Sequence, residues 1–172
     1  MNELKVEQVI ISKQGEDSSN YQKFKQIVKN KKIKVVVVSN VTSEKLAKLQ
    51  IEKDLYFDIL WPNSSNLIQE NMLNNNSIVC KLHYKNFSML FTGDIEEIAE
   101  KQILEKYKNN LKILNSTVLK VGHHGSKTSS IEEFIEAVRP RIALIGVGKN
   151  NKFGHPNESV VKRLENLRCN NL

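Results

Sequence analysis

The residues best suited to chemistry in this sequence are one aspartate and three histidines, all of them in glycine-containing loops. They occur in the segments Gly93-Asp94, Gly122-His123-His124-Gly125-Ser126 and Gly154-His155-Pro156. Carboxylate and imidazole groups are ligand types for Zn²⁺, and they also suit Mn²⁺ or Fe²⁺. A neighbouring glycine lets the backbone approach a metal ion or a phosphate closely. These residue types therefore predict a metal or phosphate site, provided that the loops converge.

Each segment also has an ordinary structural interpretation when it is taken alone. Gly93-Asp94 could be a turn or a helix cap, and Gly154-His155-Pro156 could be a turn before a helix. The pair His123-His124 could be one core histidine beside one exposed histidine. The fourth histidine, His83, lies in an alternating strand without neighbouring glycines, which favours a structural role. It is the order of the three loops and their shared position after strands that favours a site.

The elements expected around these loops form an α/β pattern. Apolar segments predict strands at residues 87–91, 118–121 and 141–147, and helices are expected around residues 95–104, 131–138 and 158–167. Each polar loop thus connects a strand to a helix. Loops at strand ends are where α/β folds collect functional groups, because the sheet fixes the backbone while the loop varies.

The first half of the chain predicts further strands and a helix. Residues 6–12 and 33–38 are rich in β-branched residues and predict two strands, the second of them buried. The helix between them begins near Ser18 and makes a parallel crossover connection. Residues 63–76 predict a loop with a short helical piece, and residues 78–84 predict the first strand of a hairpin that turns at Lys85-Asn86. With no repeat or linker, residues 1–172 are interpreted as a single domain.

The composition is that of a soluble globular protein, with 40% hydrophobic and 26% charged residues. No apolar run approaches the roughly 20 residues of a membrane-spanning helix, and residues 1–5 do not begin a secretory signal. We therefore expect a cytoplasmic chain without a membrane segment, in which Cys80 is a buried thiol and Cys169 a tail thiol. The net charge of +7 could favour phosphate-bearing partners, although the lysines are scattered.

Four segments together make a family resemblance specific. They are Asn75–Val79, Leu90–Asp94, Leu119–Ser126 and Gly154–Pro156. This set resembles the latter half of the metallo-β-lactamase-fold hydrolase domain of bacterial competence DNA-uptake channels, from about Val6 onward. Small stand-alone hydrolases and a choline-phosphate esterase of the same superfamily share much of the pattern. The resemblance implies a four-layer αββα sandwich with a metal centre at one edge of its two sheets.

The resemblance also implies roles for individual residues. Asp94 resembles the aspartate that bridges two metal ions, and either His123 or His124 resembles the late histidine ligand of the second ion. Asp94 and His124 are the catalytic candidates. His155 would be a further ligand or a substrate contact, and Ser126 and Lys127 could contact a phosphate. The implied reaction is hydrolysis by a metal-bound water, with Zn²⁺ or Mn²⁺ as the ion and a phosphodiester, such as single-stranded DNA, as substrate.

The sequence departs from the family at its main metal-binding motif. The superfamily pattern His-x-His-x-Asp-His, which would fall shortly before Val6, does not occur here. A dinuclear centre needs about six to eight protein ligands, of which this chain supplies only part. We therefore expect a partial domain with impaired activity and partial or no metal binding. The uncovered sheet, for example around residues 33–38, could drive self-association. A chain cut from a competence channel protein would be membrane-attached.

Two other functions remain open from the sequence. The first is a non-catalytic binding or structural domain that keeps the fold without a metal centre. The second is a basic nucleic-acid-binding module in which Lys120, Lys127, Lys149 and Lys152 lie near the loop edge. Binding of single-stranded DNA with an affinity that falls steeply as salt rises would support this module.

Overall fold

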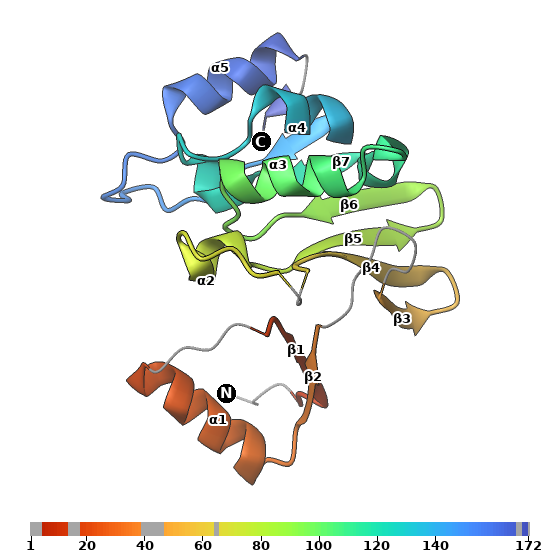
Figure 1. Ribbon diagram of the computed structural model, residues 1–172, viewed down its shortest axis with the longest axis vertical. Coiled ribbons are helices and arrows are strands. Elements are labelled where there is room, and N and C mark those ends of the chain that lie inside the picture. The colour runs from red at the N-terminus through yellow and green to blue at the C-terminus, as the bar shows by residue number, and fades with distance from the viewer. Residues whose placement is uncertain (1–4, 14–17, 39–46, 64–65, 168–169, 172) are drawn as a thin grey trace.

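A seven-stranded mixed sheet forms the centre of the computed structural model, which describes residues 5–13, 18–38, 47–63, 66–167 and 170–171 (Figure 1). Its strands, in spatial order, are β3 (Ala47–Glu52), β4 (Leu55–Trp61), β5 (Val79–Tyr84), β6 (Phe87–Phe91), β7 (Val118–Lys120), β8 (Ile142–Leu144) and β9 (Asn170–Asn171). Strands β3 to β6 pair antiparallel, whereas β6 to β9 pair parallel. Cys169 lies outside the described residues.

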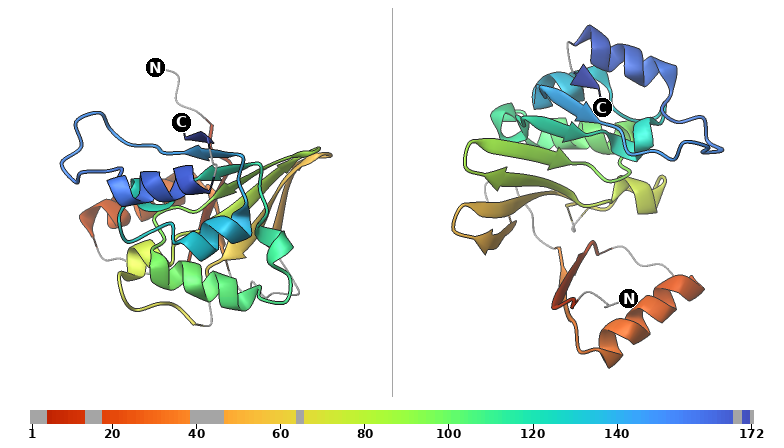
Figure 2. Two further views of the ribbon diagram at one scale, coloured as in Figure 1. Left: turned by 90° about the horizontal axis from the view of Figure 1, so that it is seen from above. Right: turned by 180° about the vertical axis from the view of Figure 1, so that it is seen from behind.

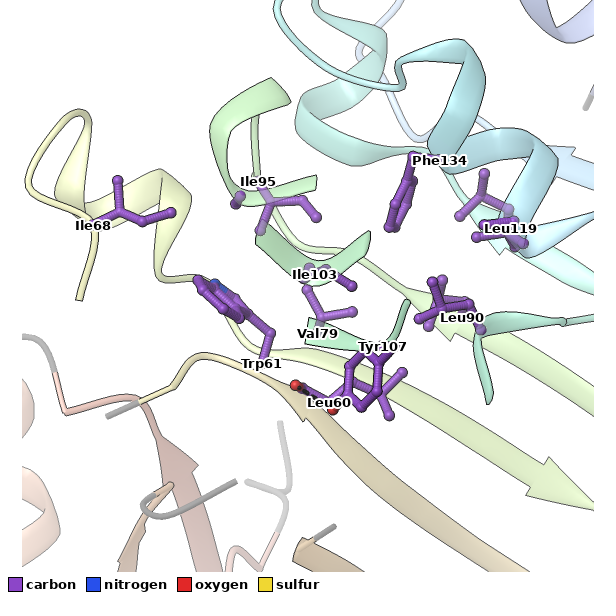
Figure 3. Close-up of a cluster of buried hydrophobic side chains, with 14 residues drawn as sticks. Leu60, Trp61, Ile68, Val79, Leu90, Ile95, Ile103, Tyr107, Leu119 and Phe134 are labelled. Atoms are coloured by element: carbon purple, nitrogen blue, oxygen red, sulfur yellow. Dashed lines mark hydrogen bonds between the residues drawn. The ribbon is translucent and has the colours of Figure 1, made fainter. Parts of the chain in front are cut away.

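Three helices cover one face of this sheet (Figure 2). They are α3 (Glu97–Lys106), α4 (Glu132–Val138) and α5 (Glu158–Asn166). Apolar side chains of α3 and α4 meet strand residues in one core, which contains Leu60, Val79, Leu90 and Leu119 from the strands and Ile103 and Phe134 from the helices (Figure 3). A second cluster joins α4, α5 and β8 through Ile135, Val160, Leu164 and Ala143. Burial of this apolar surface is the main force that fixes the strands beneath the loops.

Short elements complete the sheet's surroundings. Helix α2 (Met72–Asn75) precedes β5, the 3₁₀ turn η1 (Leu111–Leu114) precedes β7, and the 3₁₀ turn η2 (Gly122–Gly125) follows β7. The predicted hairpin turn at Lys85-Asn86, the short helical piece before β5 and the helices after the three polar loops are all confirmed. Strands β3 and β4 were not predicted from the sequence.

The first elements of the chain form a separate strand–helix–strand unit. Strand β1 (Gln8–Ile11) pairs parallel with β2 (Lys34–Val37), and helix α1 (Ser19–Asn30) makes the crossover, as predicted. Ser18 caps α1, because its Oγ accepts a hydrogen bond from the backbone N–H of Tyr21 at 3.2 Å. In Figure 1 this unit lies below the main sheet, and it contacts β4 through Val38 and Ile59.

The predicted burial of the strand at residues 33–38 is wrong. Val35 and Val37 in β2 are 39% and 44% exposed, and only Val38, just beyond the strand, is buried. The reason is tertiary: β2 pairs with β1 alone, so most of its length has no second layer to cover it. A run of valines predicts a strand from local preference but does not reveal how many layers surround it.

The face of the main sheet opposite the helices is only half covered. Phe57, Leu82 and Phe91 on this face are partly exposed, whereas Ile59 is buried against the β1–α1–β2 unit. Burial raises the pKa of the Cys80 thiol to about 11, so this side chain is an uncharged apolar group. The α/β class is thus confirmed. The four-layer sandwich, the single partial domain and self-association through this face remain predictions.

Candidate functional site

The three polar loops meet at one edge of the main sheet. Because β6, β7 and β8 are parallel neighbours, the residues that follow them emerge on the same side. Two backbone hydrogen bonds join the loops: His123 N donates to Gly93 O at 3.1 Å, and Asn157 N donates to Gly125 O at 2.8 Å. The sheet therefore brings Asp94, both histidines of the pair and the His155 loop into one region.

Asp94 follows a glycine that no other residue replaces easily. Gly93 has a φ of +58°, and a Cβ there would lie 2.7 Å from the Cβ of Ser77. The close approach lets the backbone N–H of Asp94 donate to Ser77 Oγ at 3.3 Å. The Asp94 side chain itself is 44% exposed, so its carboxylate is accessible to a ligand at the sheet edge.

The two adjacent histidines both have left-handed backbones, with φ values of 45° at His123 and 56° at His124. Such conformations are uncommon for residues with side chains and cluster at functional sites. Nδ1 of His124 lies 2.6 Å from the carbonyl oxygen of Gly146, and a carbonyl can only accept, so Nδ1 carries the proton. In the neutral ring Nε2 is then a free acceptor, and it lies 3.6 Å from Asp94 Oδ1. The Gly146 carbonyl thus fixes the tautomer and the orientation of the His124 ring.

His123 faces a buried carboxylate instead. Its Nδ1 lies 3.3 Å from Oε1 of Glu96, a residue that is only 8% exposed. Burial alone would raise the pKa of Glu96, but hydrogen bonds from Asn71 and Thr128 and the nearby His123 lower it below its usual range. Glu96 is therefore a carboxylate that lies beside the His123 ring. Sequence reasoning missed this residue, although its position two residues after Asp94 could have suggested it.

The loop before Asp94 depends on two fully buried asparagines. Asn75 accepts from the backbone N–H of Glu96 at 2.9 Å and donates to the Glu70 carbonyl at 2.9 Å. Asn76 accepts from Ile68 N at 3.0 Å and donates to Ile68 O at 2.8 Å. The asparagines of the Asn75–Val79 segment thus hold the backbone that leads to Ser77 and the Asp94 loop.

The remaining predicted site residues lie in different surroundings. His155 lies near His123, with ring centroids 5.8 Å apart. Ser126 is buried, and its Oγ lies 3.0 Å from Oγ1 of Thr128, whereas Lys127 beside it is exposed. His83 lies within β5 rather than at a loop, with Nε2 3.0 Å from Asp58 Oδ2, which agrees with a structural role.

A metal ion is not fully accommodated by this arrangement. Asp94 and His124 offer two donor atoms 3.6 Å apart, but nowhere in the described ranges do three His, Cys, Asp or Glu side chains gather closely enough to hold an ion. The donors are of the right chemical types for Zn²⁺ or Mn²⁺, but the described residues do not form a complete centre. We therefore derive no catalytic step through a metal from this geometry.

The fold and the site together define an α/β protein in which polar loops gather at the ends of parallel strands. No protein-family model matches the chain. The chain is 39% identical over 117 residues to ComE operon protein 3 of Bacillus subtilis, and this aligned region covers 68% of this chain and 14% of that protein. It is 36% identical over 108 residues to competence protein ComA of Neisseria gonorrhoeae, covering 63% of this chain and 15% of ComA.

A third relative is recombination protein 2 of Haemophilus influenzae, 36% identical over 114 residues, which covers 66% of this chain and 13% of that protein. These similarities point to the competence DNA-uptake family. The chain corresponds to a small part of each relative, between 13% and 15% of its length. None of the helices in the described part of the chain has the length and apolar character needed to cross a bilayer.

Proposed function

We propose that this chain is the C-terminal part of a metal-dependent hydrolase domain of the metallo-β-lactamase fold that cleaves phosphodiesters during DNA uptake. Asp94 and His124 would be metal ligands, with Zn²⁺ or Mn²⁺ as the ion. His123 and His155 would be additional ligands or substrate contacts. The remaining ligands would come from a segment that carries the His-x-His-x-Asp-His motif, which this sequence lacks. Activity of the chain by itself would therefore be impaired, and a competence channel would attach the domain to the membrane.

One observation carries this proposal. Nε2 of His124 and the exposed carboxylate of Asp94 lie 3.6 Å apart on two different loops, which are held by the hydrogen bonds of His124 Nδ1 to Gly146 O and of Asp94 N to Ser77 Oγ. Half of the His124 side chain is accessible to solvent, so a ligand can reach the pair. The names of the relatives support a role in competence, and DNA would be the phosphodiester that such a protein meets.

Metal binding and hydrolysis, measured together, test the proposal. The purified chain would be titrated with Zn²⁺ and Mn²⁺ against a chromogenic chelator, and hydrolysis of bis(p-nitrophenyl) phosphate would be followed. We expect weak Zn²⁺ binding that falls about tenfold in Asp94→Asn and in His124→Gln, because each variant loses one donor of a small set. His83→Gln is the matched control and keeps the wild-type affinity. Metal binding that does not depend on Asp94 would contradict the proposal.

A second function, nucleic-acid binding without catalysis, is favoured by the charges around the loops. Lys127, Lys149 and Lys152 are exposed there. Lys120 lies closer to the sheet, where burial lowers the pKa of its ammonium group although Asp94 opposes the shift. This alternative predicts binding of single-stranded DNA that weakens steeply with salt and that needs no metal.

A further inference from the structure

A hollow of about 430 Å³ adjoins the candidate site on the side of β8. It is lined by His124 and His155 and by the loop that contains Gly146, Val147, Gly148 and Phe153. A Cβ at Gly148 would meet no atom within 4 Å, so the wall here is bare backbone facing open space. The same His124 whose Nε2 faces Asp94 therefore also forms one wall of the hollow.

Phe153 at the edge of this hollow is unusually exposed for an aromatic residue. Its exposed fraction is 81%, well above the 53% of Ile27, the next large hydrophobic residue in the described ranges. The ring lies nearly parallel to that of His155, with ring centroids 5.9 Å apart and an angle of 19° between the planes. A flat apolar surface held in water next to a polar site is the property of a stacking platform.

The side chain of Asn151 makes four hydrogen bonds within the loop that presents Phe153. Oδ1 of Asn151 accepts hydrogen bonds from the backbone N–H groups of Phe153 at 3.2 Å and His155 at 3.0 Å. Its Nδ2 donates to the carbonyl oxygens of Gly148 at 3.1 Å and His155 at 2.7 Å. Because these four bonds order the loop before any ligand arrives, binding on Phe153 needs little additional ordering.

The charge of the same loop selects the kind of ligand. Residues 145–157 contain Lys149 and Lys152, both exposed, and no acidic residue. The side chain of Lys120 lies beneath the loop, where its Cε would be 3.1 Å from a Cβ at Gly146. A ligand that combines a planar ring with negative charge fits this pairing of an aromatic platform and cations. A nucleotide unit of a single strand has both features, since its base stacks and its phosphate pairs with lysine.

We propose that Phe153 stacks on a nucleobase of single-stranded DNA and so positions the adjacent phosphodiester at the Asp94–His124 edge. This inference deepens the proposed function, because it assigns the base-contacting residue of the same site. Stacking on a phenyl ring tolerates every base, so the platform favours single strands over duplexes without reading sequence. Within a duplex the bases are stacked on one another, which leaves Phe153 without a partner.

The test compares two oligomers of equal length and charge by fluorescence anisotropy, with EDTA present so that no metal contributes. One is a labelled oligodeoxythymidylate, and the other is an abasic deoxyribose-phosphate oligomer. We expect Phe153→Ala to weaken binding of the first about tenfold, equivalent to about 1.4 kcal/mol, and to leave binding of the second unchanged. Phe153→Trp restores the affinity. Phe87→Ala, at a 39% exposed phenylalanine at the start of β6, is the matched control and changes neither.

Three results would overturn the inference: equal weakening of both oligomers by Phe153→Ala, no weakening of either, or no binding of thymidylate by the wild-type chain. Failure of the proposed function is a separate outcome, because it is measured by Asp94-dependent metal binding and hydrolysis. Base-dependent binding without such metal binding would leave Phe153 as the platform of a non-catalytic DNA-binding domain. Asp94-dependent metal binding without base-dependent DNA binding would contradict the role of Phe153 and leave the proposed function standing.

Discussion

Replacing Glu100 tests how the helices behind the site hold its loops. The carboxyl group of Glu100, in α3, is 1% exposed and accepts hydrogen bonds from Ser130 N at 2.6 Å and Ile131 N at 2.9 Å. These amides precede α4 and have no helical partner of their own. Glu100→Ala leaves both without an acceptor, at about 1–3 kcal/mol each. We therefore expect the free energy of unfolding to fall by about 2–6 kcal/mol, a large part of the roughly 5–15 kcal/mol of a typical domain.

The effect should reach the site through the segment that Glu100 anchors. Ser129, next to Ser130, is buried, and its Oγ donates to the Gly122 carbonyl at 2.9 Å, directly before the histidine pair. The measurement is urea denaturation followed by the fluorescence of Trp61, the single tryptophan, which is 2% exposed in the core. Glu136→Ala, an exposed position in α4, is the control and should shift stability by less than about 0.5 kcal/mol.

Equal stability of the Glu100→Ala and Glu136→Ala variants would refute this reasoning, since it would mean that the two amides find other acceptors. Glu100→Gln should be intermediate. Its amide oxygen can accept from one backbone N–H, while its NH₂ group faces the other. A Gln variant less stable than the Ala variant would also contradict the account, because it would show that the shape of the side chain matters more than its acceptors.

Three further predictions concern pH, the Asp94 loop and the Phe153 loop. Burial raises the pKa of Glu100 from 4.5 to about 7. The folded chain then holds a proton that the unfolded chain releases, so the free energy of unfolding falls as pH rises from about 4.5 to 7. Urea midpoints measured across this pH range should fall less in Glu100→Gln than in the wild-type chain. Gly93→Ala should lower the free energy of unfolding by about 1–3 kcal/mol in the same assay, because φ is +58° and the new Cβ would lie 2.7 Å from the Cβ of Ser77. Gly148→Ala, where a Cβ meets no atom within 4 Å, is the control and should leave the free energy of unfolding unchanged. Asn151→Ala should weaken thymidylate binding with little change in thermal stability.

The strand–loop–helix order around the site could be predicted from the sequence because its signals are local. The hairpin 78–91 alternates in period two, and glycines mark where the strands at 87–91 and 118–121 end. Parallel pairing of these strands then places their loops at one edge, as the structure shows. Local pattern and tertiary arrangement agree in this half of the chain.

What could not be predicted depends on contacts between distant residues. Asn75 and Asn76 are polar residues in an asparagine-rich segment and predict an exposed loop, yet both are fully buried. Their side-chain amides make hydrogen bonds with backbone groups of Ile68, Met72 and Glu96, which satisfies the polar atoms of both partners. Glu96 and Glu100 have the sequence pattern of exposed helix residues. Their burial follows from the packing of Thr128 and Ser130 against α3, which no local pattern contains.

The spacing of His123 and His124 could not distinguish the two histidines, but their surroundings do. Consecutive left-handed residues turn the two rings toward different partners: Nδ1 of His123 lies near the buried Glu96, and Nδ1 of His124 donates to Gly146. Of the two histidines, His124 has its Nε2 close to the Asp94 carboxylate, which favours His124 as the residue that would bind the same metal ion as Asp94. His123, backed by a carboxylate and 5.8 Å from the His155 ring, is better placed to act on the His155 side of the same edge. Loss of His124 should therefore reduce Asp94-dependent metal binding more than loss of His123 does.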